Sequence, residues 1–289
     1  MFGQLVISGL AQGCIYALVA LGMTVLYRST GVVNFGYGAF FMAGAFVLYV
    51  LTQVLGLSFG LGFIGAVALM ALFGVIVDRG LIRPIINGPH VTVAMMTVAV
   101  SYFLTGVARF FWGQEVLPMP PVFDIPPIVL ADLVMTGQDL VIASACLLLV
   151  AAFFLFFART RLGKLMQAAS QVPRGAALVG INVPGFHCVM WAAAAAVAAI
   201  AGTLVAPVTM LYPDMGAHLL IKAFAAMALG GFGHFGGAVV GGVLIGVAEQ
   251  LAGGYVSTAM IDTFAYIVII VTLLIMPSGL FGRKEVVRV

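Results

Sequence analysis

The sequence predicts an all-α, polytopic transmembrane helical bundle, and three observations support this fold class. Hydrophobic residues make up 64% of the 289 residues and charged residues only 7%, whereas soluble domains carry about a quarter charged residues. The apolar residues form long runs such as 140–158 and 264–276 and do not alternate with polar ones as barrel strands require. Backbone N–H and C=O groups in lipid must be hydrogen-bonded within the protein, which only helices and closed barrels achieve. Since the barrel pattern is missing, we expect helices.

The apolar segments divide one membrane domain, residues 1–289, into roughly seven to nine crossings, with about eight as the central value. The first segment lacks a basic stretch before it, so we expect a retained span. Two short, Gly-rich segments, 219–231 and 237–253, are either separate spans or two halves of one broken or re-entrant element. In chain order the segments are 5–27, 36–55, 57–77, 91–112, 139–158, 188–210, 219–231, 237–253 and 259–276.

Basic residues predict which loops face the cytoplasm. Nine of the twelve Lys and Arg residues fall in three places, namely the loop after residue 77, the 159–187 loop and the C-terminal tail. We therefore expect a cytoplasmic C-terminus and a cytoplasmic 159–187 loop. The 113–137 loop contains no Lys or Arg and is expected to be periplasmic. Its acidic residues are Glu115, Asp124 and Asp132, and its prolines favour an extended chain.

Small residues recur at four-residue spacing in several segments, which predicts close helix packing. Gly9 with Gly13, and Gly242 with Gly246, are two such pairs. Because lipid offers no hydrophobic drive between helices, small faces that let backbones approach are a common means of association. Static packing is the simpler interpretation, and a sliding interface for alternating access is the other.

Composition and motifs exclude several functions. The net charge of +3 comes from dispersed residues that form no basic helix face, so no nucleic-acid partner is expected. Three separated cysteines and four histidines without ligand spacing give no metal site. Gly231, Gly233 and Gly236 match a dinucleotide fingerprint, but no strand precedes them. No P-loop is present, so we expect no cofactor in this chain and ATP, where needed, on a partner.

Polar stripes on two segments mark a candidate solute pathway. Positions four apart share a helix face, so each stripe faces protein or water rather than lipid. Hydrogen bonds between helices are the plain alternative, often worth only about 0.6 kcal/mol per pair. Gln12, Tyr16, Thr97 and Ser101 are the candidates for the pathway. The complete stripes are Gln4, Ser8, Gln12 and Tyr16 in the first segment, and Thr97, Ser101, Thr105 and Arg109 in the fourth.

Glu249 is a single carboxylate inside the apolar run 239–251. A charge near the middle of the bilayer costs about 3 kcal/mol or more, so Glu249 should pair with a cation or become protonated. Arg109 and Lys222 are the two candidate partners. A structural ion pair and a role in gating the pathway are both open interpretations.

The 159–187 loop is the only expected cytoplasmic connection long enough to hold helices. Pro173 and Gly175 should divide it into two short helices. Two alanine pairs supply good helix formers, and their small side chains should let another protein approach closely. We expect Ala169 and Ala177 to face water. These alanines are Ala168, Ala169, Ala176 and Ala177.

Several sequence blocks resemble the branched-chain amino acid family of ABC-transporter permeases. They are residues 9–22, residues 30–38 with Asn34, residues 225–238 with 241–249, and residues 277–282. The resemblance runs from the first segment to the tail, with the blocks in order. It implies an importer of leucine, isoleucine, valine or related solutes in the bacterial inner membrane. It also places Asn34 on the candidate pathway.

The resemblance further implies an assembly: a second homologous permease subunit, two ATP-binding subunits and a periplasmic solute-binding protein, with lipid around them. It makes residues 161–182 the element that docks on the ATPase. Residues 171–175 lack the acidic residues common there, and Met276 stands where Arg is frequent. The residues assigned to ATPase coupling are Arg161, Gly163, Ala168, Ala169, Ala176, Ala177 and Gly180.

Another class remains as the alternative function: an ion-coupled secondary transporter of a small organic solute. Such a transporter places coupling carboxylates or unwound backbone at mid-membrane, and Glu249 alone satisfies this requirement. Rings typical of a channel filter are not evident. No nucleophile, base and orienting group occur together, so we do not expect an enzyme.

Overall fold

The computed structural model describes residues 1–86, 88–121, 126–130 and 133–282. Seven helices in these residues are long and apolar enough to cross a membrane, and two shorter apolar helices accompany them. The predicted all-α polytopic bundle is confirmed, and the helices fall within the expected range of crossings. Asp124, Asp132 and the basic tail residues Arg283, Lys284 and Arg288 lie outside the described residues.

The N-terminal half contains four of the long helices. The first ends at Gly31, whose φ of 68° gives a left-handed cap that glycine adopts without strain. The second and third each run on into a short π-helix. In order, the elements are α1 (Phe2–Thr30), α2 (Tyr37–Tyr49), η1 (Val50–Val54), α3 (Phe59–Val77), η2 (Asp78–Ile82) and α4 (His90–Trp112).

The C-terminal half begins with a two-stranded antiparallel hairpin, in which Val129 pairs with Val134. Its first long helix starts at a capping box, where Thr136 and Asp139 satisfy each other's backbone N–H groups. In order, the elements are β1 (Ile128–Leu130), β2 (Leu133–Met135), α5 (Gly137–Arg159), α6 (Arg161–Gln171), α7 (Pro173–Leu178), α8 (Val183–Thr209), α9 (Met215–Gly230), α10 (Phe235–Tyr255) and α11 (Met260–Ile275).

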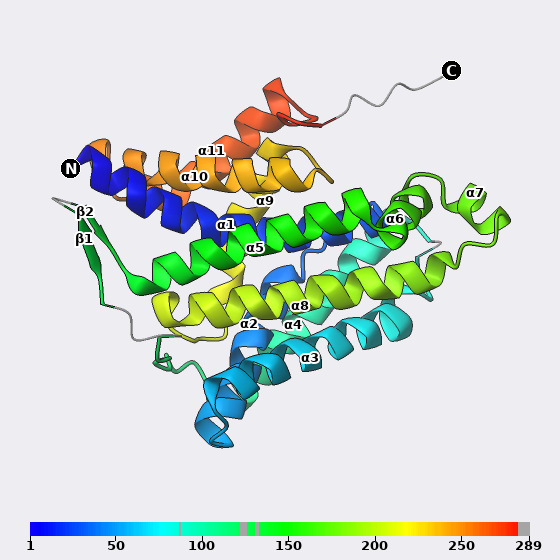
Figure 1. Cartoon of the computed structure of the whole chain (residues 1–289), viewed down its shortest axis with the longest axis horizontal. Helices are drawn as coiled ribbons and strands as arrows, with labels where there is room; N and C mark the ends of the chain where they lie inside the picture. Colours follow the sequence, from blue (N-terminus) through cyan, green and yellow to red (C-terminus); the bar gives the residue numbers. More distant parts are fainter. Residues whose placement is uncertain (87, 122–125, 131–132, 283–289) are drawn as a thin grey trace.

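The long helices α1, α5, α8 and α10 run along the long axis of the molecule (Figure 1). The N-terminus and the β1–β2 hairpin lie at one end of this axis, where the Gln4 side chain donates a 2.9 Å hydrogen bond to the Val134 carbonyl. Helices α6 and α7 lie at the other end. The expected periplasmic loop and the expected cytoplasmic loop are therefore at opposite ends of the bundle.

Glycines bring α1 and α10 into direct backbone contact, as the small-residue spacing predicts. A Cβ added at Gly13 would lie 2.7 Å from the Val243 Cα, and one at Gly246 would meet the Gly13 backbone. Real Cβ atoms do not approach so closely, so neither position accepts a side chain without moving a helix. The two helices therefore pack backbone to backbone along this face.

The two short Gly-rich segments form two separate helices. The turn between α9 and α10 contains Gly231 and Gly233, with φ of 102° and 78°. Helix α10 has 21 residues and is long enough to span a membrane, whereas α9 has 16. Gly282 packs against Gly231, so the segment after α11 closes over the same turn.

Candidate functional site

A buried ion pair joins α9 to α10 in the core of the bundle. The Lys222 ammonium contacts the Glu249 carboxylate directly, and the two side chains are 13% and 1% exposed. The expectation that Glu249 pairs with a cation is confirmed, and the partner is Lys222 rather than Arg109. Removing either partner would leave the other one buried without its counter-charge.

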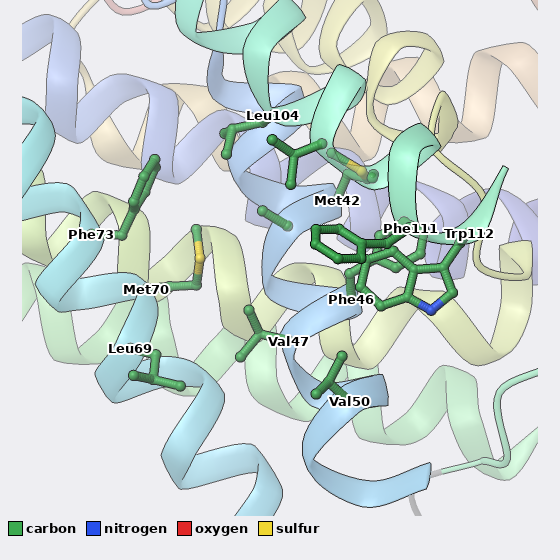
Figure 2. A pocket seen from close by; sticks show the side chains of 13 residues that line it. Met42, Phe46, Val47, Val50, Leu69, Met70, Phe73, Leu104, Phe111 and Trp112 are labelled. Carbon is green, nitrogen blue, oxygen red and sulfur yellow. The ribbon is translucent and has the colours of Figure 1, made fainter. Parts of the chain in front are cut away.

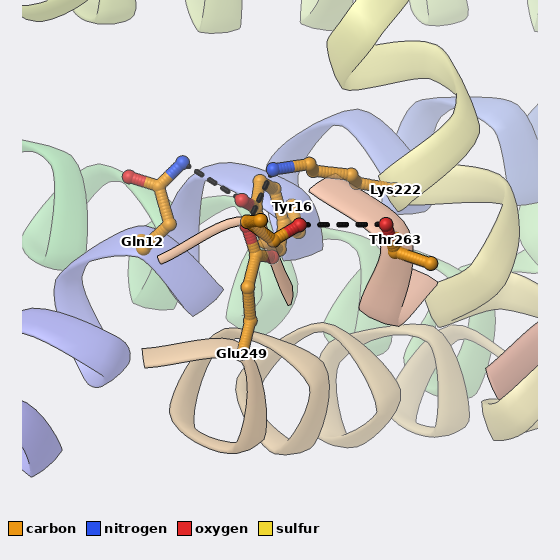
Figure 3. Close-up of polar contacts among 6 residues, drawn as sticks. Gln12, Tyr16, Lys222, Glu249 and Thr263 are labelled. Carbon is orange, nitrogen blue, oxygen red and sulfur yellow. Dashed lines mark hydrogen bonds and ion pairs between the residues drawn. The ribbon is translucent and has the colours of Figure 1, made fainter. Parts of the chain in front are cut away.

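Two residues of α1 complete this buried site, as Figure 3 shows. The Gln12 amide donates a 3.0 Å hydrogen bond to the Tyr16 hydroxyl, and the Lys222 ammonium lies 5.6 Å from the centre of the Tyr16 ring. The face of an aromatic ring attracts a cation at this distance. Gln12, Tyr16, Lys222 and Glu249, here named the Glu249 cluster, therefore tie three helices together.

Arg109 forms a second ion pair at the surface. Its guanidinium donates to both carboxylate oxygens of Asp214, at 2.7 and 2.8 Å. Both side chains are 47% exposed, and the pair links the last turn of α4 to the residue before α9. Sequence reasoning missed Asp214, which stands alone after Pro213 without a periodic partner.

Asn34 and Thr97 position the connection between α1 and α2. The Thr97 hydroxyl accepts a 3.1 Å hydrogen bond from the Phe35 backbone N–H, and the Asn34 side-chain oxygen accepts one of 2.8 Å from Gly36. Both side chains are buried. In this conformation they hold the loop against α4 and do not face an open space.

Three of the cavities between the described helices bear on the candidate pathway. The outer cavity, about 440 Å³, is beside the β1–β2 end and has several polar residues in its wall: Ser8, Gln12, Gln138, Asp139 and Gln250. The α4–α9 cavity measures about 220 Å³ and is lined by Ser101, Thr105 and Asp214 together with small and aliphatic residues. The third, about 410 Å³, lies among α2, α3 and α4 and is lined by apolar side chains alone (Figure 2).

The candidate pathway residues therefore separate into two groups. Gln12 and Ser101 are half-buried and line the outer cavity and the α4–α9 cavity, respectively. The other candidates, Tyr16, Asn34, Thr97 and Glu249, are buried. The described contacts are all within the protein and do not show whether these residues meet a solute. Their role in a pathway therefore stays a prediction. Sequence reasoning also missed Gln138, Asp139 and Gln250, because only the packing of α1, α5 and α10 brings them together.

The 159–187 segment forms two short helices, α6 and α7, as Pro173 predicts. The expectation that Ala169 faces water is wrong, because Ala169 is 4% exposed, and Ala176 is buried as well. Gly163 is buried too, because it packs on the Phe157 backbone at the end of α5. The remaining residues assigned to coupling are exposed or at the surface: Arg161, Ala168, Ala177 and Gly180.

An apolar surface remains uncovered on α7 and beside it. Leu178 is 89% exposed, and Val172 and Val179 are also largely exposed. We name these three residues the α7 surface. Among the described residues, no group of three potential ligands is placed to hold a metal ion.

The fold and these sites define a multi-pass helical membrane protein with charges paired inside its bundle. The chain belongs to the family described as "branched-chain amino acid transport system / permease component", whose model matches residues 5–276. The resemblance noted in the sequence is therefore confirmed, and the chain is a transport permease.

Curated relatives match along almost the whole chain. The high-affinity branched-chain amino acid transport system permease protein LivH of Salmonella typhimurium is 31% identical, over 100% of this chain and 98% of its own. BraD of Pseudomonas aeruginosa is 28% identical over 99% and 97%. The probable LivH of Methanocaldococcus jannaschii is 29% identical over 92% and 88%.

One solved structure is similar in outline. A chain of "PsaBC from Streptococcus pneumoniae in complex with Fab" aligns with a TM-score of 0.49 at 16% identity, covering 95% of this chain and 92% of that chain. This similarity is too low to support a functional conclusion.

Proposed function

We propose that this chain is the permease subunit of an ATP-binding-cassette importer that moves branched-chain or related amino acids across the bacterial inner membrane. Energy comes from two separate ATP-binding subunits, a second homologous permease completes the pore, and a periplasmic protein delivers the solute. The relatives supply the solute class, since LivH and BraD are named as branched-chain amino acid permeases. The observation that carries the coupling part is the α7 surface.

Orientation follows from charge. The α6–α7 end carries Arg159, Arg161, Lys164 and Arg174 in its connecting segment, whereas residues 113–137 at the other end contain no Lys or Arg. Basic loops remain in the cytoplasm, so α6 and α7 are cytoplasmic. The chain after α11 is cytoplasmic for the same reason.

The α7 surface is suited to a protein partner. It lies outside the spanning helices α5 and α8, so lipid tails do not cover it, and exposed apolar groups away from lipid mark interaction sites. In the preceding helix α6, Ala169 is buried and lines a small cavity together with Phe186 and Met190 of α8. Helices α6 and α7 contact each other and both contact α8, so a displacement of either would reach a spanning helix.

The alternative, an ion-coupled secondary transporter, is less well supported. Its coupling carboxylate must exchange a proton or a cation with water. Glu249 instead contacts Lys222 and lines none of the three cavities.

The test changes the α7 surface without changing the core. Leu178→Glu should abolish co-purification with the ATP-binding subunits and ATP-driven uptake, because it places a charge in the centre of the contact. Ala177→Glu should act in the same direction. Val116→Glu is the matched control: an exposed apolar residue in the loop at the other end, whose substitution should leave ATPase association intact. Normal association of Leu178→Glu would remove the coupling assignment.

A further inference from the structure

We infer that the α4–α9 cavity binds the charged end of the transported α-amino acid, with Asp214 receiving the ammonium group and Arg109 the carboxylate. This inference rests on the proposed function and assigns a solute site within it. Asp214 lies in the cavity wall, and Arg109 contacts both of its carboxylate oxygens.

The ion pair is suited to exchange with a zwitterion. Both side chains are 47% exposed, so a solute reaches them without unfolding the bundle. An α-amino acid carries one charge of each sign on neighbouring atoms. When it inserts between Arg109 and Asp214, it replaces one internal pair by two new pairs and leaves no charge unpaired. Arginine is also the residue whose planar fork best matches a carboxylate.

The rest of the cavity matches a small aliphatic solute. Its volume is about 220 Å³, and a cavity of roughly 150 Å³ already admits benzene. Leu220 and Ile221 supply an aliphatic wall, and Ser101 and Thr105 of α4 supply hydroxyl groups. Small residues complete the lining: Gly38, Ala39, Gly216 and Ala217.

Asp214 lines the α4–α9 cavity with Arg109 bonded to it from outside the lining, whereas neither of the other two cavities has a described acid–base pair at its wall. The apolar cavity of Figure 2 has no charged or hydroxyl side chain in its lining, so it would leave both ends of a zwitterion unpaired. The outer cavity contains Asp139, but this carboxylate is already bonded to the Thr136 hydroxyl and backbone. No described Lys or Arg lines the outer cavity or pairs with Asp139, so a zwitterion bound there would leave its carboxylate without a cation.

Photolabelling locates the site directly. Membranes containing the full-length chain are irradiated with an L-leucine analogue that carries a diazirine in its side chain, and labelled peptides are mapped by mass spectrometry. We expect adducts in residues 101–105 and 213–221, competed by L-leucine. Isoamylamine and isocaproate, which each lack one charge, should compete at least about tenfold more weakly, because a charged hydrogen bond is lost. Adducts confined to the outer cavity, or equal competition by isoamylamine, would overturn the inference.

Two sets of variants separate binding from folding. Asp214→Asn should reduce labelling at least about tenfold. The double variant Arg109→Asp/Asp214→Arg restores an ion pair but exchanges its ends. A binding role predicts that labelling stays reduced in this variant, and a structural role predicts that labelling recovers. Ser101→Ala should weaken labelling, whereas Ser144→Ala, a serine of α5 bonded to its own helix, should not.

Failure of the inference differs from failure of the proposed function. ATP-driven leucine uptake by the wild-type complex, with no competed adducts in the α4–α9 cavity, would overturn only the site. Competed adducts in that cavity without ATP-driven uptake would support the site and overturn the importer.

Discussion

The ion pair between Lys222 and Glu249 makes the sharpest prediction about stability. Glu249→Leu removes the buried carboxylate and leaves the Lys222 ammonium, only 13% exposed, without its acid partner. Glu249→Gln keeps the shape and an oxygen acceptor but removes the negative charge. Lys222→Met removes the cation, and Lys222→Met with Glu249→Leu removes both charges.

The expected magnitudes follow from burial. Breaking one side of a buried ion pair costs about 3–5 kcal/mol. Because the ammonium keeps its contact with the Tyr16 ring at 5.6 Å, worth roughly 0.5–2 kcal/mol, we expect about 3 kcal/mol for Glu249→Leu. The Gln variant should lose slightly less, since its amide oxygen still accepts a hydrogen bond. The double variant should be within about 1 kcal/mol of wild type, because apolar replacement of a buried pair is often neutral.

The assay is denaturant unfolding in mixed micelles, read as a double-mutant cycle. A coupling energy below about 0.5 kcal/mol would refute the reasoning, because it would mean that both side chains are solvated. Asp214→Leu is the control, since it breaks the exposed pair with Arg109 and should leave the free energy of unfolding nearly unchanged. For the Lys222 and Glu249 variants, we expect uptake to fall in proportion to the loss of stability. A stable double variant without uptake would instead assign the pair to gating.

Two further predictions concern helix packing and the expected periplasmic loop. Gly246→Ala should destabilise the protein by about 1–3 kcal/mol in the same unfolding assay, because the new Cβ meets the Gly13 backbone. Gly106→Ala is the control and should be neutral or stabilising, because Gly106 has open space around it. Equal effects of the two substitutions would mean that α1 and α10 are not in contact. Reversing the charge of the three acidic residues in the 113–137 loop should weaken binding of the solute-binding protein, measured by surface plasmon resonance, because docking depends on complementary charge. Membrane insertion should stay intact. Unchanged binding would exclude the loop as the docking site. The residues reversed to Lys are Glu115, Asp124 and Asp132.

The spanning helices were predictable because hydropathy is a local property. The 139–158 run predicts α5 within a few residues, and Pro173 predicts the break between α6 and α7. Both depend on the chemistry of neighbouring residues alone. The division of residues 219–253 was less certain, because a helix of 16 residues is near the length at which hydropathy no longer distinguishes a crossing from a partial one.

Partner choice was not predictable, because it depends on how helices pack. Arg109 and Lys222 were equal candidates for Glu249, and only the arrangement of α4, α9 and α10 gives Lys222 to Glu249 and Arg109 to Asp214. The burial of Ala169 also depends on how the helices pack, and the sequence alone predicts that it faces water. Its small size favours close contact with any neighbour, and the neighbour proved to be α8 of the same chain.

The central claim is that this chain transports solute only when ATP-binding subunits drive it. The direct measurement is uptake of labelled L-leucine into proteoliposomes that contain the chain, its partner permease and the ATP-binding subunits, with the binding protein added outside. We predict uptake that requires ATP in the lumen and is lost when either Leu178→Glu is introduced or this chain is omitted. Equal uptake without ATP, driven by a proton or sodium gradient alone, would contradict the account.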